Sequence, residues 1–276
     1  MGFRDGNAPT GPGMRTILIG RGLLVIASAS VAVLTVYGGE SALLGQSLPH
    51  WLPWRDGWVY GCALAVLAAS VGLCFKRTAL VGVSIIAAYY LLWALTCVPA
   101  VMKAPLSVLA WYGLCEAVTS LVGPWILYIL LKRQASGLTG TDMLQVRIAQ
   151  VLFGLTCIFY GWSHFAFAQY TASMVPGWLP GRLAWAYLTG LGHIAAGIGM
   201  TVWVLPHLAA FLEAVMMSLF GLLVWVPSFF MQPRPAWAGS PQGQWSELIL
   251  TLVLATSAWI VYGATSVRHS AAPKTL

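Results

Sequence analysis

Uninterrupted apolar stretches are the main feature of the sequence. Eight of them follow one another along the chain, and none shows the strict polar–apolar alternation of a membrane β-strand. Each is close to the roughly 20 residues that an α-helix needs to cross a bilayer. The pattern therefore predicts an all-α polytopic integral membrane protein. Its eight expected transmembrane helices lie at residues 16–38, 58–75, 78–98, 111–131, 147–168, 183–204, 208–228 and 245–265.

The composition agrees with this pattern and excludes other classes of protein. Of the 276 residues, 59% are hydrophobic and only 8% are charged, whereas about 25% of the residues of a soluble domain are charged. The helices leave no room for a large soluble domain. The net charge of +7 arises from a shortage of acidic residues rather than from a basic patch. A nucleic-acid partner is therefore excluded, and membrane lipids are the expected surroundings.

Basic residues are distributed unevenly between the two predicted faces of the membrane. Loops that face the cytoplasm carry an excess of Lys and Arg, so the richer face is assigned to the cytoplasm. Both termini are then cytoplasmic, and the protein is expected in the inner membrane of a bacterium. The richer face has Arg4, Arg15, Arg21, Lys76, Arg77, Lys132, Arg133, Arg147, Arg268 and Lys274, and the other has Arg55, Lys103, Arg182 and Arg234.

The sequence contains an internal repeat. A shift of 127 positions superposes residues 49–55 on residues 176–182, matching two prolines, a tryptophan, a leucine and an arginine. Because each copy has an even number of helices, the two copies keep the same orientation in the membrane. The predicted organisation is a cytoplasmic segment at 1–15, a four-helix unit at 16–133, a cytoplasmic linker at 134–146, a second four-helix unit at 147–267 and a cytoplasmic tail at 268–276.

Two histidines lie within predicted helices of the second unit. His193 is about ten residues from the outer end of its helix, hence roughly 15 Å deep and near the bilayer centre. His164 lies near the outer end of the preceding helix, where it either forms a polar pocket with His193 and Tyr187 or lies at the membrane interface with its polar tip in water. His193 then either carries protons or binds a quinone carbonyl, or it is a neutral imidazole held by a neighbouring helix. No ligand spacing around the pair is typical of haem or a metal ion.

Three glutamates within the apolar stretches also call for partners, since an unpaired intramembrane charge is costly. Glu213 lies at a depth that Arg21 and Arg147 reach from the cytoplasmic face, so we predict an ion pair between Glu213 and one or both arginines. Glu116 and Glu247 occupy equivalent positions near the outer starts of their helices. These outward-facing carboxylates either complement the helix dipole or guide protons or cations.

Three segments of the second unit resemble the DoxX family of bacterial four-helix membrane proteins. They are residues 147–165, the Pro-rich loop 175–180 and the small-residue segment 186–199. The resemblance covers about residues 147–265, and residues 16–132 more weakly. It implies a membrane redox context, since the family is associated with a quinol oxidase and with thiosulfate:quinone oxidoreduction, and it makes quinone a candidate cofactor. This chain differs from the family in being a fused pair and in having His193 where relatives often place an acidic residue.

Three functions fit these observations. The first is a non-catalytic accessory or structural subunit of a bacterial membrane-bound redox or energy-conversion complex, respiratory or photosynthetic, with other membrane subunits as partners. The second is a quinone-reactive subunit that acts through the histidine pocket. The third is a small-solute carrier, for which duplicated units are typical. The sequence contains no recognised catalytic motif, so we assign no catalytic residue and expect no catalysis by this chain alone.

Overall fold

The computed structural model of the chain describes residues 12–39, 53–134 and 136–271, which are mostly helical and contain no strand. Eight of its helical segments are long and apolar enough to cross a membrane, which confirms the predicted all-α polytopic architecture. They are α1 (Pro12–Gly38), α2 (Arg55–Cys74), α3 (Ala79–Lys103), α4 (Val108–Lys132), α5 (Gly140–Ala166), α7 (Arg182–Val202), the segment from α8 (Pro206–Phe220) through η1 (Gly221–Trp225) to α9 (Val226–Ser228), and α10 (Pro241–Ala271). The short helices α6 (Ala168–Met174) and η2 (Ala236–Ala238) lie between them.

Some of the predicted features fall outside the described residues. These are Arg4 and Lys274, most of the N-terminal segment, part of the C-terminal tail and residues 49–52 of the repeat. The remaining loops that carry basic residues are described.

The fifth long helix begins earlier than its apolar run, so the linker is shorter than predicted. A capping box starts α5, in which the hydroxyl of Thr139 accepts a hydrogen bond from the Asp142 amide while the Asp142 carboxylate accepts one from the Thr139 amide. Arg133, at the end of α4, forms an ion pair with Asp142 at 2.8 Å. The polar residues that indicated a loop therefore form the first turns of α5.

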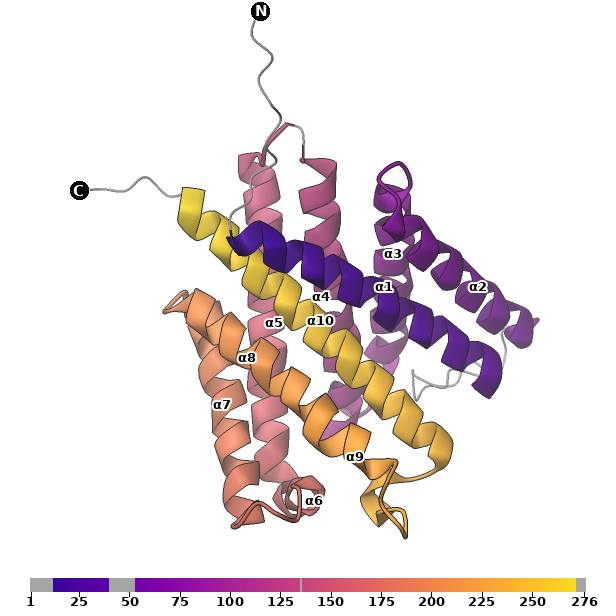
Figure 1. Cartoon of the computed structure of the whole chain (residues 1–276), viewed down its shortest axis with the longest axis vertical. Helices are drawn as coiled ribbons and strands as arrows, with labels where there is room; N and C mark the ends of the chain where they lie inside the picture. The colour runs from indigo at the N-terminus through magenta and orange to yellow at the C-terminus, as the bar shows by residue number, and fades with distance from the viewer. Residues whose placement is uncertain (1–11, 40–52, 135, 272–276) are drawn as a thin grey trace, which may run out of the picture.

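The two repeats pack against each other through their first and last helices. In Figure 1, α1 and α10 run side by side, with α2 and α3 on one side of the molecule and α7 and α8 on the other. In the same way α5, the first helix of the second repeat, packs against α4, the last helix of the first repeat. The two last helices, α4 and α10, also contact each other. Each repeat thus places its first helix on the last helix of the other, and a single apolar core runs through both.

Equivalent arginines make equivalent contacts in the two repeats. Arg21 on α1 donates from Nε to the carbonyl oxygen of Leu73 at 2.9 Å, and Arg147 on α5 donates to that of Met200 at 2.7 Å. Leu73 and Met200 are related by the shift of 127 positions that relates the two copies of the sequence. The last turn of the second helix is therefore held in the same way in both units.

Glycines allow α5 and α7 to approach at backbone distance. A Cβ atom on Gly197 would lie 2.4 Å from the carbonyl oxygen of Gly154, and one on Gly161 would lie 2.4 Å from that of Gly190. Such close contacts between small residues are typical of helix packing in membranes, where apolar side chains gain little by leaving lipid. This contact fixes the register of α5 against α7, and hence the relative heights of the polar residues that these helices carry.

Candidate functional site

A buried histidine–glutamate pair lies at the centre of the second unit. His193 on α7 contacts Glu213 on α8, with 2.9 Å from Nδ1 to Oε1 and 3.1 Å from Nδ1 to Oε2. Each residue is only 1% exposed. A buried imidazole that meets a carboxylate through Nδ1 donates its Nδ1–H to it, which fixes the tautomer and holds the ring in one orientation.

The predicted partners of Glu213 are bound elsewhere, which corrects the expected ion pair. Arg147 donates to the carbonyl oxygens of Met200 and Thr201, each at 2.7 Å, and its guanidinium lies 4.3 Å from the centre of the Trp203 ring. Arg21 is held by Leu73 in the same manner. The last carbonyls of a helix lack partners within the helix and carry the negative end of its dipole, so they attract these cations. In the described residues, Glu213 is paired with His193 instead.

The structure places His164 next to His193. The two ring centres are 5.2 Å apart and the rings meet edge to face. Nδ1 of His164 lies 3.0 Å from the hydroxyl of Thr189 and 3.3 Å from the carbonyl oxygen of Ala186, both on α7. The third predicted member, Tyr187, stacks on Phe165 with ring centres 5.4 Å apart and is 39% exposed. It therefore lies at the surface rather than against the pair.

Two aromatic residues that were not among the predicted site residues enclose the histidines. Phe220 lies 5.7 Å from His193 and 6.0 Å from His164 between ring centres, and stacks on the latter. Tyr160 on α5 lies 6.1 Å from His193. The π-helical turn η1 begins directly after Phe220, and such turns are frequent at functional sites. The pair is thus shielded by aromatic rings rather than open to water.

A cluster of hydroxyl groups adjoins the pair at the contact between the repeats. The hydroxyl of Thr119 on α4 donates to Thr156 on α5 at 2.8 Å and lies 3.0 Å from the hydroxyl oxygen of Tyr160. All three residues are buried. Their chain positions carry no motif, so the sequence could not have indicated them. Only the packing of α4 against α5 brings the three together.

Glu116 and Glu247 lie beyond the first turn of their helices, which is where a negative charge complements the helix dipole. Neither α4 nor α10 has an acidic residue in its first turn, and α4 begins at a cap formed by Ser107, whereas the dipole acts mainly within that turn. Glu116 is half-buried and Glu247 is exposed. The two carboxylates are close enough to interact electrostatically. Their positions do not support the dipole interpretation, and the alternative of a carboxylate pair that guides protons or cations stays a prediction.

Tyr170 on α6 belongs to the same end of the molecule. Its hydroxyl donates to the carbonyl oxygen of Trp237 at 3.1 Å. Burial raises the pKa of Tyr170, and the negative charge of Glu247 raises it further. Tyr170 therefore stays neutral beside these carboxylates.

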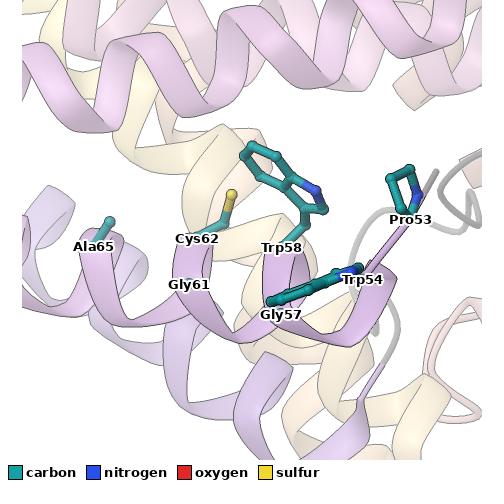
Figure 2. Close-up of a pocket in the computed structure, with 7 residues that line it drawn as sticks. All are labelled: Pro53, Trp54, Gly57, Trp58, Gly61, Cys62 and Ala65. Carbon is teal, nitrogen blue, oxygen red and sulfur yellow. The ribbon is translucent and has the colours of Figure 1, made fainter.

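A groove lies along α2, in the first unit. It has a volume of about 740 Å³ and is lined by Pro53, Trp54, Gly57, Trp58, Gly61, Cys62 and Ala65. Figure 2 shows Trp58 and Cys62 pointing to the same side of the helix. A Cβ atom on Gly61 would meet nothing within 4 Å. Because α2 is a membrane-spanning helix, this apolar surface contacts lipid.

Comparison with known proteins leaves the family open. No family model matches this chain, and no curated protein or solved structure is significantly similar to it. In the described residues, no group of three or more His, Cys, Asp or Glu side chains is arranged to hold a metal ion, and none of the five cysteines forms a disulfide. The fold defines a multi-pass membrane protein, and its most distinctive chemical group is the pair formed by His193 and Glu213.

Proposed function

We propose that this chain is a subunit of a membrane-bound redox complex and that the His193–Glu213 pair exchanges a proton with a quinone or quinol. The observation that carries the proposal is the buried carboxylate–imidazole contact, in which Nδ1 of His193 lies 2.9 Å from Oε1 of Glu213. Ionisable groups inside a membrane protein commonly mark substrate sites or proton relays. Bacterial origin, the cytoplasmic termini and the DoxX resemblance belong to the same proposal.

The pair is suited to receive a proton from a quinol. Glu213 accepts the Nδ1–H of His193, so the lone pair of Nε2 is free to accept the proton of a quinol hydroxyl. The imidazolium that forms is stabilised by the adjacent carboxylate. In the reverse direction, Nε2–H donates to a quinone carbonyl oxygen. The rings of His164, Tyr160 and Phe220 lie around the imidazole of His193.

The same chemistry requires a partner. A quinol that loses its protons also gives up two electrons, and these must pass to a redox centre such as a haem or an iron–sulfur cluster. We assign that centre to another subunit of the complex, with this chain supplying the proton acceptor. The proposal thus joins the accessory-subunit interpretation to the quinone-reactive one.

Binding of a short-chain quinone to the purified chain in lipid nanodiscs tests the proposal. The fourteen tryptophans provide the signal, since quinones quench indole fluorescence. We expect saturable quenching by decyl-ubiquinone or a menaquinone analogue, weakened at least about tenfold in His193→Leu, since a hydrogen bond to a charged or buried group contributes about 1.5–3 kcal/mol. His207→Leu is the matched control, because His207 stacks on Tyr262 away from the pair. Equal quenching in both variants and in the unaltered chain would refute the quinone assignment.

Native mass in mild detergent tests the subunit part. A particle that contains other polypeptides at fixed stoichiometry is expected, and a particle of this chain alone contradicts it.

A further inference from the structure

The groove along α2 is lined at a regular four-residue spacing. Its described lining residues occupy two adjacent positions of each four-residue step along the chain: Pro53, Trp54, Gly57, Trp58, Gly61, Cys62 and Ala65. Because four residues slightly exceed one helical turn, such residues form a stripe that winds slowly around the helix. Two membrane helices whose small residues recur at this spacing pack closely with a right-handed crossing. From Trp54 to Ala65 the stripe is about 16 Å long, roughly half the thickness of the bilayer core.

The stripe combines a furrow with a ridge. The furrow is formed by the small residues Gly57, Gly61 and Ala65, and the ridge by the larger residues Trp54, Trp58 and Cys62. All three furrow residues are exposed, and a Cβ atom on Gly61 would meet no described atom within 4 Å. Trp58 is 57% exposed and points to the same side of α2 as Cys62 (Figure 2). The backbone of α2 is therefore open to close contact along the furrow, beside projecting side chains.

The second repeat shows that the fold itself does not require a glycine in the furrow. The shift of 127 positions places Leu188 at the position of Gly61, and its side chain is 55% exposed. In contrast, Gly154 and Gly197 are needed where α5 and α7 meet at backbone distance. A glycine inside a helix is less stable than an alanine. A glycine that no neighbouring helix of the same chain uses points to a contact outside the chain.

A second copy of the chain is the partner that this surface fits. Two copies that cross the membrane in the same direction are related by a two-fold axis along the membrane normal, which places equivalent residues at equal depth. The ridge of each copy then lies in the furrow of the other, so the stripe is complementary to itself. Its described residues include no charged side chain, so no like charges face each other. Close van der Waals packing drives helix association in lipid, and a matched ridge and furrow provide it.

We propose that two copies of this chain form a dimer through α2, with Gly61 where the two helices cross. In Figure 1, α2 and α3 lie on one side of the molecule and α7 and α8 on the other. A dimer through α2 therefore leaves the face of α7 and α8 open to lipid and to other subunits. The inference goes beyond the proposed function and does not depend on it, because the dimer uses no residue of the His193–Glu213 pair.

Two native cysteines of α2 allow a cross-linking test on the full chain in membranes. Cys62 lies in the ridge, whereas Cys74 is exposed on nearly the opposite side of the same helix, since each residue turns the helix by about 100°. Two variants keep only one of these cysteines, with the others replaced by alanine. Oxidation by copper phenanthroline joins thiols whose Cα atoms lie within about 7 Å of each other. We expect disulfide-linked dimers of the Cys62 variant and none of the Cys74 variant.

Energy transfer between donor-labelled and acceptor-labelled chains, diluted with lipid in vesicles, measures the strength of the dimer. Gly61→Leu introduces the residue that the second repeat carries at this position, so the variant is expected to fold. It should weaken dimerisation at least about tenfold, because the leucines hold the two backbones apart. Gly22→Leu is the matched control and should leave dimerisation unchanged, because Gly22 is an exposed glycine of α1 whose Cβ atom would also meet nothing within 4 Å.

Several results would overturn the dimer. These are energy transfer no higher than that of randomly mixed monomers, equal cross-linking of Cys62 and Cys74, or unchanged dimerisation in Gly61→Leu. A monomer whose groove holds only lipid, or cross-linking of Cys62 to a different polypeptide, would overturn it as well. Each of these results leaves the quinone assignment in place, since that assignment is tested by fluorescence quenching.

Discussion

At the scale of single residues, the charge of a buried ionisable group is compensated by its contact partner, and its depth along the helix does not identify that partner. Glu213 is 1% exposed and is paired with His193 on the neighbouring helix. Arg147 instead donates to a carbonyl oxygen at the end of α7. Removing one member of a buried pair leaves the other without compensation, which is far more destabilising than removing both. The pair is therefore expected to behave as a unit.

A double-mutant cycle on the pair tests this behaviour. We expect His193→Leu and Glu213→Leu each to lower the free energy of unfolding by about 2–4 kcal/mol, and the double variant to lower it by clearly less than the sum. Reversible unfolding in mixed SDS micelles provides the measurement. Effects that add to within about 0.5 kcal/mol would show that the two side chains are independent.

At the scale of helices, the positions of glycines decide how closely two helices can pack. Gly154 and Gly197 face each other across α5 and α7, whereas Gly61 on α2 faces open space. All three lie within membrane-spanning helices. The same residue type thus has a structural role in one helix and little in another.

Alanine substitutions at two of these glycines make a matched comparison. Gly197→Ala should lower the free energy of unfolding by about 1–3 kcal/mol, because the new Cβ would lie 2.4 Å from a backbone oxygen and the helices must separate. Gly61→Ala should change it by less than about 0.5 kcal/mol. Thermal unfolding in nanodiscs distinguishes the two, and equal losses would contradict the close approach of α5 and α7.

The arginines that hold the second helix of each repeat offer another comparison between equivalent positions. Arg147→Met removes donors to two carbonyl oxygens and a contact with Trp203, while Arg21→Met removes donors to one carbonyl oxygen. We expect a loss of about 1–3 kcal/mol for Arg147→Met and a smaller one for Arg21→Met. Denaturant unfolding measures both, and the reverse order would contradict the assigned contacts.

At the scale of the whole molecule, the duplication produces one body rather than two. The first helix of each repeat packs on the last helix of the other, as α1 and α10 show in Figure 1. The repeats have nevertheless diverged in chemistry. The pair of His193 and Glu213 is confined to the second unit, while the α2 groove belongs to the first.

The orientation in the membrane is open to a direct test. The native thiol of Cys74 is exposed at the end of α2, next to Lys76 and Arg77, and the distribution of basic residues assigns this end to the cytoplasm. A membrane-impermeant maleimide should label Cys74 only after cells are opened, and Arg234→Cys should be labelled in intact cells. Cys74→Ser provides the control, and labelling of Cys74 in intact cells would reverse the orientation.

Sequence reasoning reached the candidate site only in part. It singled out His193, His164 and Glu213, because polar residues stand out in apolar stretches, and it estimated their depths from the rise of a helix. It assigned Glu213 to the wrong partner and did not find Tyr160 or Thr119. Depth along a helix can be read from residue number, but the direction in which a side chain points depends on how each helix is rotated against its neighbours.

The length of the apolar stretches predicted the number of spanning helices and their approximate bounds, and internal similarity predicted the duplication, because both are properties of the chain alone. The helix packing then showed what these patterns could not: the first helix of each repeat packs on the last helix of the other, Arg147 binds the carbonyls at the end of α7, and His193 contacts Glu213. Lipid accepts any apolar face, so hydropathy places a helix in the membrane but leaves its neighbours to be selected by close contacts between particular residues.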